Sequence, residues 1–407
     1  ARSAAFFDGF VKCFWQKKWG ILIKKESESL IFTGLEIPRD YYTMTEDFYM
    51  KVGLAGTGWR AQMYVRVMKA LGEEFEVSAV YVHSESSRER EEKNFPGKVY
   101  TDYDEFLATK PDCVVFMLKY GAALPFAEKA MEQGIPVLCE TPPAATVEEL
   151  QAWYQAKEKY NGKVQVAEQY CFQPYYQALI HMIDQGKMGT ISNLDISQAH
   201  DYHGMSVMRR LLGTGMENCR ITARTYDFPV NYHCGREGLH KGEKTIVDTR
   251  KRAEFVFPDG KVGFFDFAGE QYFNYFRTRH LTLQGDCGEV HDQQAAWLGQ
   301  DGYPVWGSIQ RDELGQYSNL EGYGMRSLRL NGEILYRNPY ADRDLRLTDE
   351  EIAVAQMMEG MKTYVETGKE VYPLEEALQD TYLFLMMDEA AKEGKEIQTQ
   401  DQCWKKQ

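Results

Sequence analysis

The chain has 407 residues, of which 43% are hydrophobic and 27% are charged. This is the composition of a globular protein, and the length favours two domains. The net charge of −14 argues against nucleic acid or an anionic membrane as a partner. No apolar run reaches the roughly 18 residues of a membrane-spanning helix. The eight cysteines are scattered without a C-x-x-C pair, which is typical of reduced thiols and predicts a cytoplasmic protein.

Residues 1–49 are unlike the rest of the chain, because aromatic residues in them are interrupted by lysines. They lack the unbroken apolar stretch and the small-residue cleavage site of a secretory signal. We favour upstream sequence read in frame, with Met50 as the initiator and Thr45-Glu46-Asp47 encoded near a purine-rich ribosome-binding site. The alternative is a native extension that packs on a neighbour. In both cases we expect the function to lie after Met50.

The stretch MKVGLAGTGWRA, which begins at Met50, carries the most specific motif of the chain. It reads as an apolar strand, then G-x-G-x-x-A, then a predicted helix over residues 62–71. Gly56 permits a tight turn, and Gly58 lets the backbone approach a pyrophosphate that the N–H groups of the helix start can bind. The stretch predicts a dinucleotide site that includes Gly56, Gly58, Trp59, Arg60 and Ala61.

The second predicted strand, residues 76–82, ends without the carboxylate that usually binds the ribose 2′-hydroxyl of NAD. Ser84, Ser86 and Arg88 follow it and suit a 2′-phosphate, which favours NADP. Glu85 offers an alternative contact to the ribose, and the serines can instead cap the next helix. The predicted cofactor is therefore NAD or NADP, with Ser84 and Arg88 as candidate contacts.

Strands and helices continue to alternate after this point. Residues 113–118 and 135–139 are unbroken apolar runs, as expected for strands that are buried on both faces. Helices are predicted over residues 104–109 and 124–133, and Thr146 is placed to cap another one. This alternation predicts an α/β fold with a doubly wound parallel sheet.

Together, these motifs resemble the Gfo/Idh/MocA oxidoreductases, because G-x-G-x-x-A precedes a strand ending near Leu118 and the sequence Gly134-x-x-Val-Leu-Cys-Glu-x-Pro142. The resemblance covers about residues 50–396. It implies a nicotinamide cofactor and a second, α+β domain with a large, mostly antiparallel open sheet that carries a sugar or cyclitol site. It also implies a Rossmann domain over residues 50–165, a substrate domain over residues 166–407 that ends in helices, and a homodimer or homotetramer formed through the second sheet.

Two positions depart from the family pattern. The family usually has Glu-Lys-Pro where this chain has Glu140-Thr141-Pro142, so the ammonium that polarises the reacting hydroxyl is missing, and Thr141 offers only a neutral hydrogen bond. Lys119 follows a parallel strand at its carboxyl end, where ligands bind. We expect Lys119 to replace the missing ammonium, the alternative being a solvent-facing lysine. The residues predicted to line the cofactor here are Leu118, Glu140, Thr141 and Pro142.

The segment AHDYHGMSVMRRLLG, residues 199–213, follows a predicted strand over residues 191–197. It resembles the family's helix that opens with Asp-x3-His, so that His203 matches the histidine, Ala199 replaces the aspartate, and Asp201 is offset. Alcohol oxidation needs a base, and histidine titrates near working pH. His203 is thus predicted as general base, assisted by Lys119 or Asp201, although it can instead bond to the backbone at the helix start. His200 and Tyr202 are candidate substrate contacts.

Sheet strands are predicted over residues 253–257, 262–267, 272–279 and 281–284, with Asp259-Gly260 as a hairpin turn. Tyr272 begins an alternation with Tyr275, Arg277 and Arg279 that suits either carbohydrate or a partner subunit. Two helices are predicted near the end, one capped by Thr348 and one over residues 374–391. No metal site is predicted, because the nearby histidines and cysteines match no compact ligand spacing.

We expect an NAD(P)-dependent oxidoreductase that transfers hydride from a hydroxyl of a sugar, glycoside or cyclitol to the nicotinamide. One alternative keeps NAD bound and oxidises a glycoside transiently, so that the aglycone is eliminated. A second is a cofactor-binding regulator without turnover, which the missing lysine and aspartate permit. A third is a reductase of a non-sugar carbonyl or imine.

Overall fold

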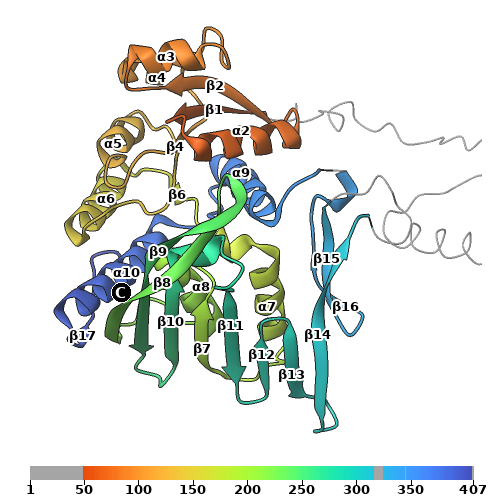
Figure 1. Cartoon of the computed structure of the whole chain (residues 1–407). Helices are drawn as coiled ribbons and strands as arrows, with labels where there is room; N and C mark the ends of the chain where they lie inside the picture. The colour runs from red at the N-terminus through yellow and green to blue at the C-terminus, as the bar shows by residue number, and fades with distance from the viewer. Residues whose placement is uncertain (1–48, 316–323, 344, 406–407) are drawn as a thin grey trace, which may run out of the picture. The chain divides into compact units, whose positions relative to one another are not determined.

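The computed structural model describes residues 49–315, 324–343 and 345–405, and the predictions for residues 1–48 lie outside it. Its first sheet is parallel and six-stranded, in the order β3-β2-β1-β4-β5-β6 (Figure 1). This is the strand order of a doubly wound dinucleotide fold, so the predicted α/β class is confirmed. The strands are β1 (Met50–Ala55), β2 (Phe75–Tyr81), β3 (Val99–Tyr100), β4 (Cys113–Phe116), β5 (Val137–Cys139) and β6 (Val164–Val166).

Helices connect these strands at the predicted places. Helix α2 begins at Trp59, three residues earlier than predicted, because Gly58 already acts as its N-cap. The Thr146 hydroxyl accepts the Glu149 N–H at 3.2 Å, which confirms the predicted cap of α6. The helices are α2 (Trp59–Leu71), α3 (Glu85–Glu91), α4 (Tyr103–Ala108), α5 (Leu124–Glu132) and α6 (Val147–Tyr160).

The second sheet has 11 strands among the described residues, in the order β16-β15-β14-β13-β12-β11-β7-β10-β9-β8-β17. Its pairs are antiparallel except for β7 with β10. The large, mostly antiparallel sheet implied by the resemblance is thus present. The strands are β7 (Ile191–Ser197), β8 (Arg220–Gly235), β9 (Gly238–Val256), β10 (Val262–Ala268), β11 (His280–Gly285), β12 (Gly288–His291), β13 (Gln294–Leu298), β14 (Pro304–Glu313), β15 (Met325–Leu330), β16 (Glu333–Arg337) and β17 (Ile397–Gln398).

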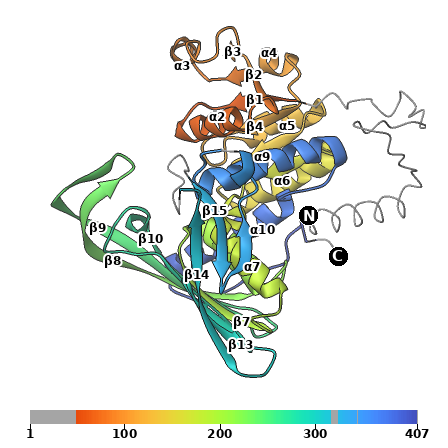
Figure 2. The same ribbon diagram turned by 90° about the vertical axis from the view of Figure 1, so that its right-hand side faces the viewer.

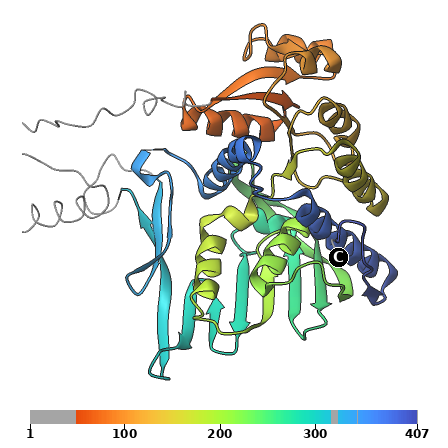
Figure 3. The same ribbon diagram turned by 180° about the vertical axis from the view of Figure 1, so that it is seen from behind.

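Helices cover one face of this sheet and leave the other face open, as Figures 1 and 3 show from opposite sides. The α-helices of this half are α7 (Pro174–Asp184), α8 (Asp201–Leu212), α9 (Asp349–Thr367) and α10 (Leu374–Glu393). The short 3-10 helices are η2 (Tyr170–Phe172), η3 (Gly269–Tyr272) and η4 (Ala341–Arg343). Thr348 forms the predicted capping box with Glu351 at the start of α9. No helix of the described residues is long and apolar enough to cross a membrane.

The last two long helices return to the first sheet. Helix α9 packs on α2, and α10 packs on α6 and α8. The segment before α10 also borders β6, since the Val166 N–H donates to the Tyr372 carbonyl at 3.0 Å and Gln165 Oε1 accepts the Tyr372 N–H at 2.8 Å. The segment before α10 therefore helps to position the end of β6.

The prediction of a strand over residues 272–279 is wrong. These residues form the end of η3 and a loop, whose backbone groups bond locally instead of to a neighbouring strand. The Asn274 N–H donates to the Glu270 carbonyl at 2.8 Å, and the Phe276 N–H donates to Asn274 Oδ1 at 2.8 Å. The alternation that begins at Tyr272 therefore does not define a sheet face.

Strand β9 is much longer than predicted, and β8 was not predicted from the sequence. Strand β9 pairs with β10 only from Arg250 to Val256, whereas it pairs with β8 back to Gly238. Residues 227–249 consequently extend past β10 as two strands, which we call the β8–β9 ribbon (Figure 2). The predicted strand over residues 253–257 is only the base of β9.

A buried ion-pair network fixes α8 to α10. The Arg209 side chain is 4% exposed and donates to Asp380 at 2.6 Å and to Glu376 at 2.8 Å. Its Nε also donates to the Gly215 carbonyl at 3.0 Å. Because α8 carries His203 and begins directly after His200, this network holds the candidate site in register with α10.

Replacement of Arg209 by alanine is expected to lower the free energy of unfolding by about 3–5 kcal/mol, because it leaves the buried Asp380 carboxylate without a cation, although the Tyr372 hydroxyl still donates to it. Urea unfolding followed by circular dichroism measures this change. Arg210→Ala removes an exposed arginine from the same helix and should change the stability by less than about 0.5 kcal/mol. Equal unfolding midpoints for the two variants would contradict the role of the network.

Candidate active site

The turn after β1 has the geometry that its glycines predict. Gly56 has a φ of +108°, and a Cβ atom there would lie 2.5 Å from the Met117 carbonyl oxygen. A Cβ atom on Gly58 would meet nothing within 4 Å. Gly58 precedes α2 without a side-chain cap, and the first turn of α2 has no acidic residue. The N–H groups of the helix start thus face open space, which fits the pyrophosphate of a dinucleotide.

Arg60 does not point into this open space. Its Nε donates to Glu140 at 2.8 Å and its Nη1 to Glu350 of α9 at 2.6 Å, while the Tyr64 hydroxyl donates to Glu140 at 2.6 Å. The predicted contacts Arg60 and Glu140 therefore bond to each other. Arg60 Nη2 and Gln169 Oε1 are buried without a partner among the described residues. These unpaired groups, a donor and an acceptor, also fit a polar ligand between the turn and α9.

The predicted 2′-phosphate contacts lie after β2 but already have partners. The Ser84 hydroxyl accepts the Ser87 N–H at 3.3 Å and so caps α3. Arg88 pairs with Glu85 at 3.6 Å on the exposed side of α3. The structure thus shows the helix cap, and the phosphate site stays a prediction. The choice between NAD and NADP stays with it.

Lys119 and Thr141 lie on two neighbouring loops of the first sheet. The Lys119 side chain is exposed and forms no ion pair with any described residue. Its neighbour Tyr120 reaches α8, where the Tyr202 hydroxyl lies 3.3 Å from the Tyr120 hydroxyl and donates to the Thr141 carbonyl at 3.4 Å. The structure thus connects Tyr202 to both loops, whereas the role of Lys119 stays a prediction. Leu118 lines the turn beside Gly56, and Thr141 and Pro142 follow the end of β5.

The pair of Glu168 and His203 forms the buried centre of the site. Glu168 Oε2 lies 2.6 Å from His203 Nδ1, and the two residues are 1% and 5% exposed. Glu168 also accepts the Tyr170 N–H at 2.9 Å, and the Tyr170 ring stacks on His203 with centroids 4.2 Å apart. His203 Nε2 bonds to no described residue and is not fully buried, so a ligand can reach it.

Burial governs the protonation of this pair. It raises the pKa of Glu168 to about 8, because a carboxylate there loses its solvation. It also lowers the pKa of His203, an effect that the nearby His200 and Arg60 strengthen. The pair therefore carries no net charge at neutral pH and loses one proton at about pH 8.

The remaining predicted substrate residues surround His203. The His200 ring lies 4.9 Å from the His203 ring, and the Tyr202 ring lies 4.5 Å from it. The Tyr272 hydroxyl accepts the His200 N–H at 3.2 Å and lies 3.0 Å from the Tyr170 hydroxyl. Tyr272 therefore reaches the site from η3 although its predicted strand is absent.

Asp201 opens α8 with a φ of +44°, an uncommon conformation for a residue other than glycine. Its carboxylate lies 3.4 Å from His200 Nδ1 and accepts from Lys251 Nζ at 3.0 Å. Lys251 comes from β9 and also pairs with Asp388 of α10. The ammonium that the structure places beside Asp201 is thus Lys251, which sequence analysis did not select.

Two groups in this site were missed from the sequence. Glu168 follows a buried strand at the carboxyl edge of a parallel sheet, a position where ligand sites form, so a signal for it existed. Lys251 had no such signal, because it is one of several cations on a long, mostly polar strand. Within the described residues, no group of three or more His, Cys, Asp or Glu side chains is arranged to hold a metal ion.

This fold and site define a dinucleotide-binding protein with a Rossmann sheet, a large open sheet and a polar, aromatic cluster where the two meet. Residues 50–168 match the model of the oxidoreductase family with an NAD-binding Rossmann fold. The resemblance to the Gfo/Idh/MocA family seen in the sequence is therefore confirmed over residues 50–168. The segment is an NAD-binding Rossmann fold.

The chain is also similar to a curated Bacillus subtilis protein, "Putative oxidoreductase YteT", with 30% identity over 110 residues. This alignment covers 26% of this chain and 26% of that protein. Among solved structures, an Agrobacterium radiobacter oxidoreductase in complex with NAD+, L-tartaric acid and magnesium matches with a TM-score of 0.62 and 15% identity, covering 86% of this chain and 98% of that chain. Lactobacillus casei scyllo-inositol dehydrogenase with bound NAD(H) and scyllo-inositol matches with a TM-score of 0.59 and 16% identity, covering 86% and 99%. The two structures share the fold.

Alanine at Gly56 and at Gly58 should have different effects. Gly56→Ala is expected to destabilise the chain by about 1–3 kcal/mol, because the new Cβ atom meets the Met117 carbonyl and the positive φ is strained. Gly58→Ala should leave stability nearly unchanged but weaken NAD binding, because its Cβ atom enters the open space of the turn. Thermal unfolding and calorimetric NAD titration separate the two effects. Unchanged NAD affinity in Gly58→Ala would place the pyrophosphate elsewhere.

Proposed function

We propose that this chain is an NAD(P)-dependent oxidoreductase that oxidises a hydroxyl of a sugar, glycoside or cyclitol. The Glu168–His203 pair carries the proposal, because alcohol oxidation needs a base for the hydroxyl proton. The family match of residues 50–168 and the scyllo-inositol bound by the L. casei enzyme support it. A bound nicotinamide would accept the hydride. The described cysteines are all free, which suits the cytoplasm expected from the sequence.

In this proposal His203 Nε2 accepts the proton of the substrate hydroxyl. The neutral pair holds two protons. One lies between the Glu168 carboxyl group and His203 Nδ1, and the other is on Nε2, so Nε2 cannot act as a base. After the pair loses one proton, the Nδ1–H donates to the Glu168 carboxylate and Nε2 presents a lone pair. Glu168 therefore fixes the tautomer and the ring orientation of His203.

The residues around His203 suit a polyhydroxylated substrate. His200, Tyr202 and Tyr272 offer ring faces together with polar atoms, and such mixed groups bind the apolar faces and the hydroxyls of sugars and cyclitols. Asp201 supplies a carboxylate that Lys251 holds in place at 3.0 Å. We infer that Lys251 supplies part of the positive charge lost with the family lysine, because Lys119 is exposed.

The rate of alcohol oxidation is expected to rise with pH through about 8, since the pKa of Glu168 is raised to about 8 and only the deprotonated pair leaves His203 free to accept a proton. The charged and titratable groups that face the pair are Glu140, His200, Arg60 and Glu350. In Glu168→Gln the carboxyl titration is lost, and the rising limb should move to lower pH, because the pKa of the buried imidazole is lowered. The measurement is kcat/KM against pH with inositols, free sugars and methyl glycosides.

His203→Ala is the matched test of the base itself and should reduce kcat by about a hundredfold or more. His181→Ala, on the exposed side of α7, serves as the control and should leave kcat unchanged. A rising limb that stays at the same pH in Glu168→Gln would contradict the assignment of that titration to the pair. If the wild type reduces no nicotinamide with any of these compounds, the regulator alternative gains support instead.

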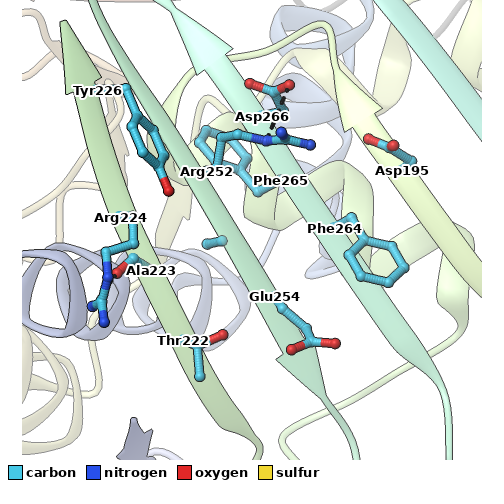
Figure 4. A pocket seen from close by; sticks show the side chains of 11 residues that line it. Asp195, Thr222, Ala223, Arg224, Tyr226, Arg252, Glu254, Phe264, Phe265 and Asp266 are labelled. Carbon is cyan, nitrogen blue, oxygen red and sulfur yellow. Dashed lines mark hydrogen bonds and ion pairs between the residues drawn. The ribbon is translucent and has the colours of Figure 1, made fainter. Parts of the chain in front are cut away.

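We also propose that the chain forms a homo-oligomer through the open face of the large sheet. A hollow of about 390 Å³ lies on this face across β7 to β10. Figure 4 shows that Tyr226, Phe264 and the Arg252–Asp266 ion pair line it. Phe264 is 39% exposed and Tyr226 is 47% exposed. Aromatic and paired charged side chains on one open face suit burial against a second copy.

Light scattering during size-exclusion chromatography should give the mass of a dimer or tetramer. Phe264→Glu is expected to shift this mass toward the monomer, because it places an unpaired charge in the interface. Tyr303→Glu changes an exposed residue in the turn between β13 and β14, outside the sheet face, and should leave the mass unchanged. A monomeric wild type at micromolar concentration would overturn this part of the proposal.

A further inference from the structure

The β8–β9 ribbon depends on contacts outside its own pairing. A two-stranded ribbon alone is only marginally stable in water. The loop after η3 fixes its middle, since Asn274 Nδ2 donates to the Asn231 carbonyl at 2.9 Å and Arg277 donates to the Pro229 carbonyl at 3.0 Å. Figures 1 and 2 show the ribbon rising from the large sheet toward α2. Its direction is therefore set by the same loop that delivers Tyr272 to the candidate site.

The tip of the ribbon contacts the first residue of α2, next to the dinucleotide turn. Arg236 lies in the two-residue loop between β8 and β9, and its guanidinium lies 4.2 Å from the centroid of the Trp59 ring. Trp59 is the first residue of α2 and directly follows Gly58. The Trp59 ring is 52% exposed, so the arginine covers only part of it. A residue more than 170 positions along the chain is thus brought beside the phosphate turn.

The charge of Arg236 has no counter-ion in the described part of the chain. Its side chain forms no ion pair and donates no hydrogen bond to any described residue, because the neighbouring Glu237 pairs with Tyr232 and His240 instead. Arg236 also lies at the N-terminal end of α2, where the helix dipole is positive and repels a cation. The cation–π contact with Trp59 offsets only part of this cost. Arg236 is exposed, so water solvates its charge, and an anion between Arg236 and the helix end would be attracted by both.

We propose that Arg236 is a phosphate clamp: when the dinucleotide binds, the guanidinium bonds its pyrophosphate from the side opposite to the N–H groups of α2, and the β8–β9 ribbon covers it. The inference rests on the cofactor part of the proposed function, and the anion it needs comes from the family match of residues 50–168. A guanidinium suits this role, because its planar fork binds two phosphate oxygens at once. The large-sheet half thereby controls how fast the cofactor leaves.

Arg236→Ala is expected to weaken NAD binding by about tenfold to a hundredfold, mainly through faster dissociation. Isothermal titration calorimetry with the full chain gives the affinity, and stopped-flow tryptophan fluorescence gives the dissociation rate. Arg236→Lys keeps the charge but loses the fork, so it should fall between the wild type and Arg236→Ala. ADP-ribose, which keeps the pyrophosphate and lacks nicotinamide, should show the same loss as NAD.

Lys241→Ala is the matched control, because it removes an exposed cation from the same ribbon without touching Trp59. It should bind NAD as the wild type does. Equal affinities and dissociation rates for Arg236→Ala and Lys241→Ala would overturn the clamp while leaving the proposed function intact. A loss confined to NADP would overturn the pyrophosphate assignment and place Arg236 on the 2′-phosphate. A wild type that binds neither NAD nor ADP-ribose would overturn the cofactor proposal and the clamp together.

Discussion

The contact between Glu168 and His203 is the constraint on which the chemistry of this protein depends. It joins the end of the Rossmann sheet to helix α8 of the large-sheet half, and both side chains are almost fully buried. A buried carboxyl group and an imidazole 2.6 Å apart share protons as one unit, so their protonation follows from burial and not from either side chain alone. The base strength proposed for His203 is thus a property of the fold.

Helices α9 and α10 maintain this contact. The segment before α10 borders β6 through Tyr372, and α10 holds α8 through the buried ion pair of Arg209 and Asp380. Helix α9 supplies Glu350, which binds Arg60 directly after the phosphate turn. A shift of either helix would therefore move the cofactor turn, Glu168 and His203 together. This explains how two separate sheets can build one site.

The local features were predictable because their signals lie within a few residues. Gly56 indicates a turn that a side chain would block. Thr146 indicates the start of a helix, because its hydroxyl bonds to a residue three positions away. The alternation after Tyr272 led to a wrong strand prediction. Turn residues such as Asn274 can also alternate with aromatic residues, and they accept hydrogen bonds from nearby backbone N–H groups. The β8–β9 ribbon was missed because both of its faces are largely polar, so no apolar alternation marks its strands.

The candidate site was only half predictable for a related reason. The resemblance pointed to His203, but its partner Glu168 lies 35 residues away in the sequence, and local periodicity does not encode which distant side chains meet. Lys251 of β9 reaches Asp201, and Arg236 at the tip of the β8–β9 ribbon reaches Trp59. The positions of both depend on the whole large sheet. In each case the chemistry of the residue was visible, whereas its neighbour was set by tertiary packing.

The most direct test of the central claim is the transfer of deuterium from a substrate carbon to the bound nicotinamide in a single turnover. The protein loaded with NAD or NADP is mixed with inositols, free sugars or methyl glycosides that are deuterated on carbon, and the nucleotide is analysed by mass spectrometry. The account predicts a reduced nucleotide that gains one deuterium in the wild type, at a rate about a hundredfold or more above that of His203→Ala. A protein that binds the nucleotide but acquires no label from any of these compounds would contradict it.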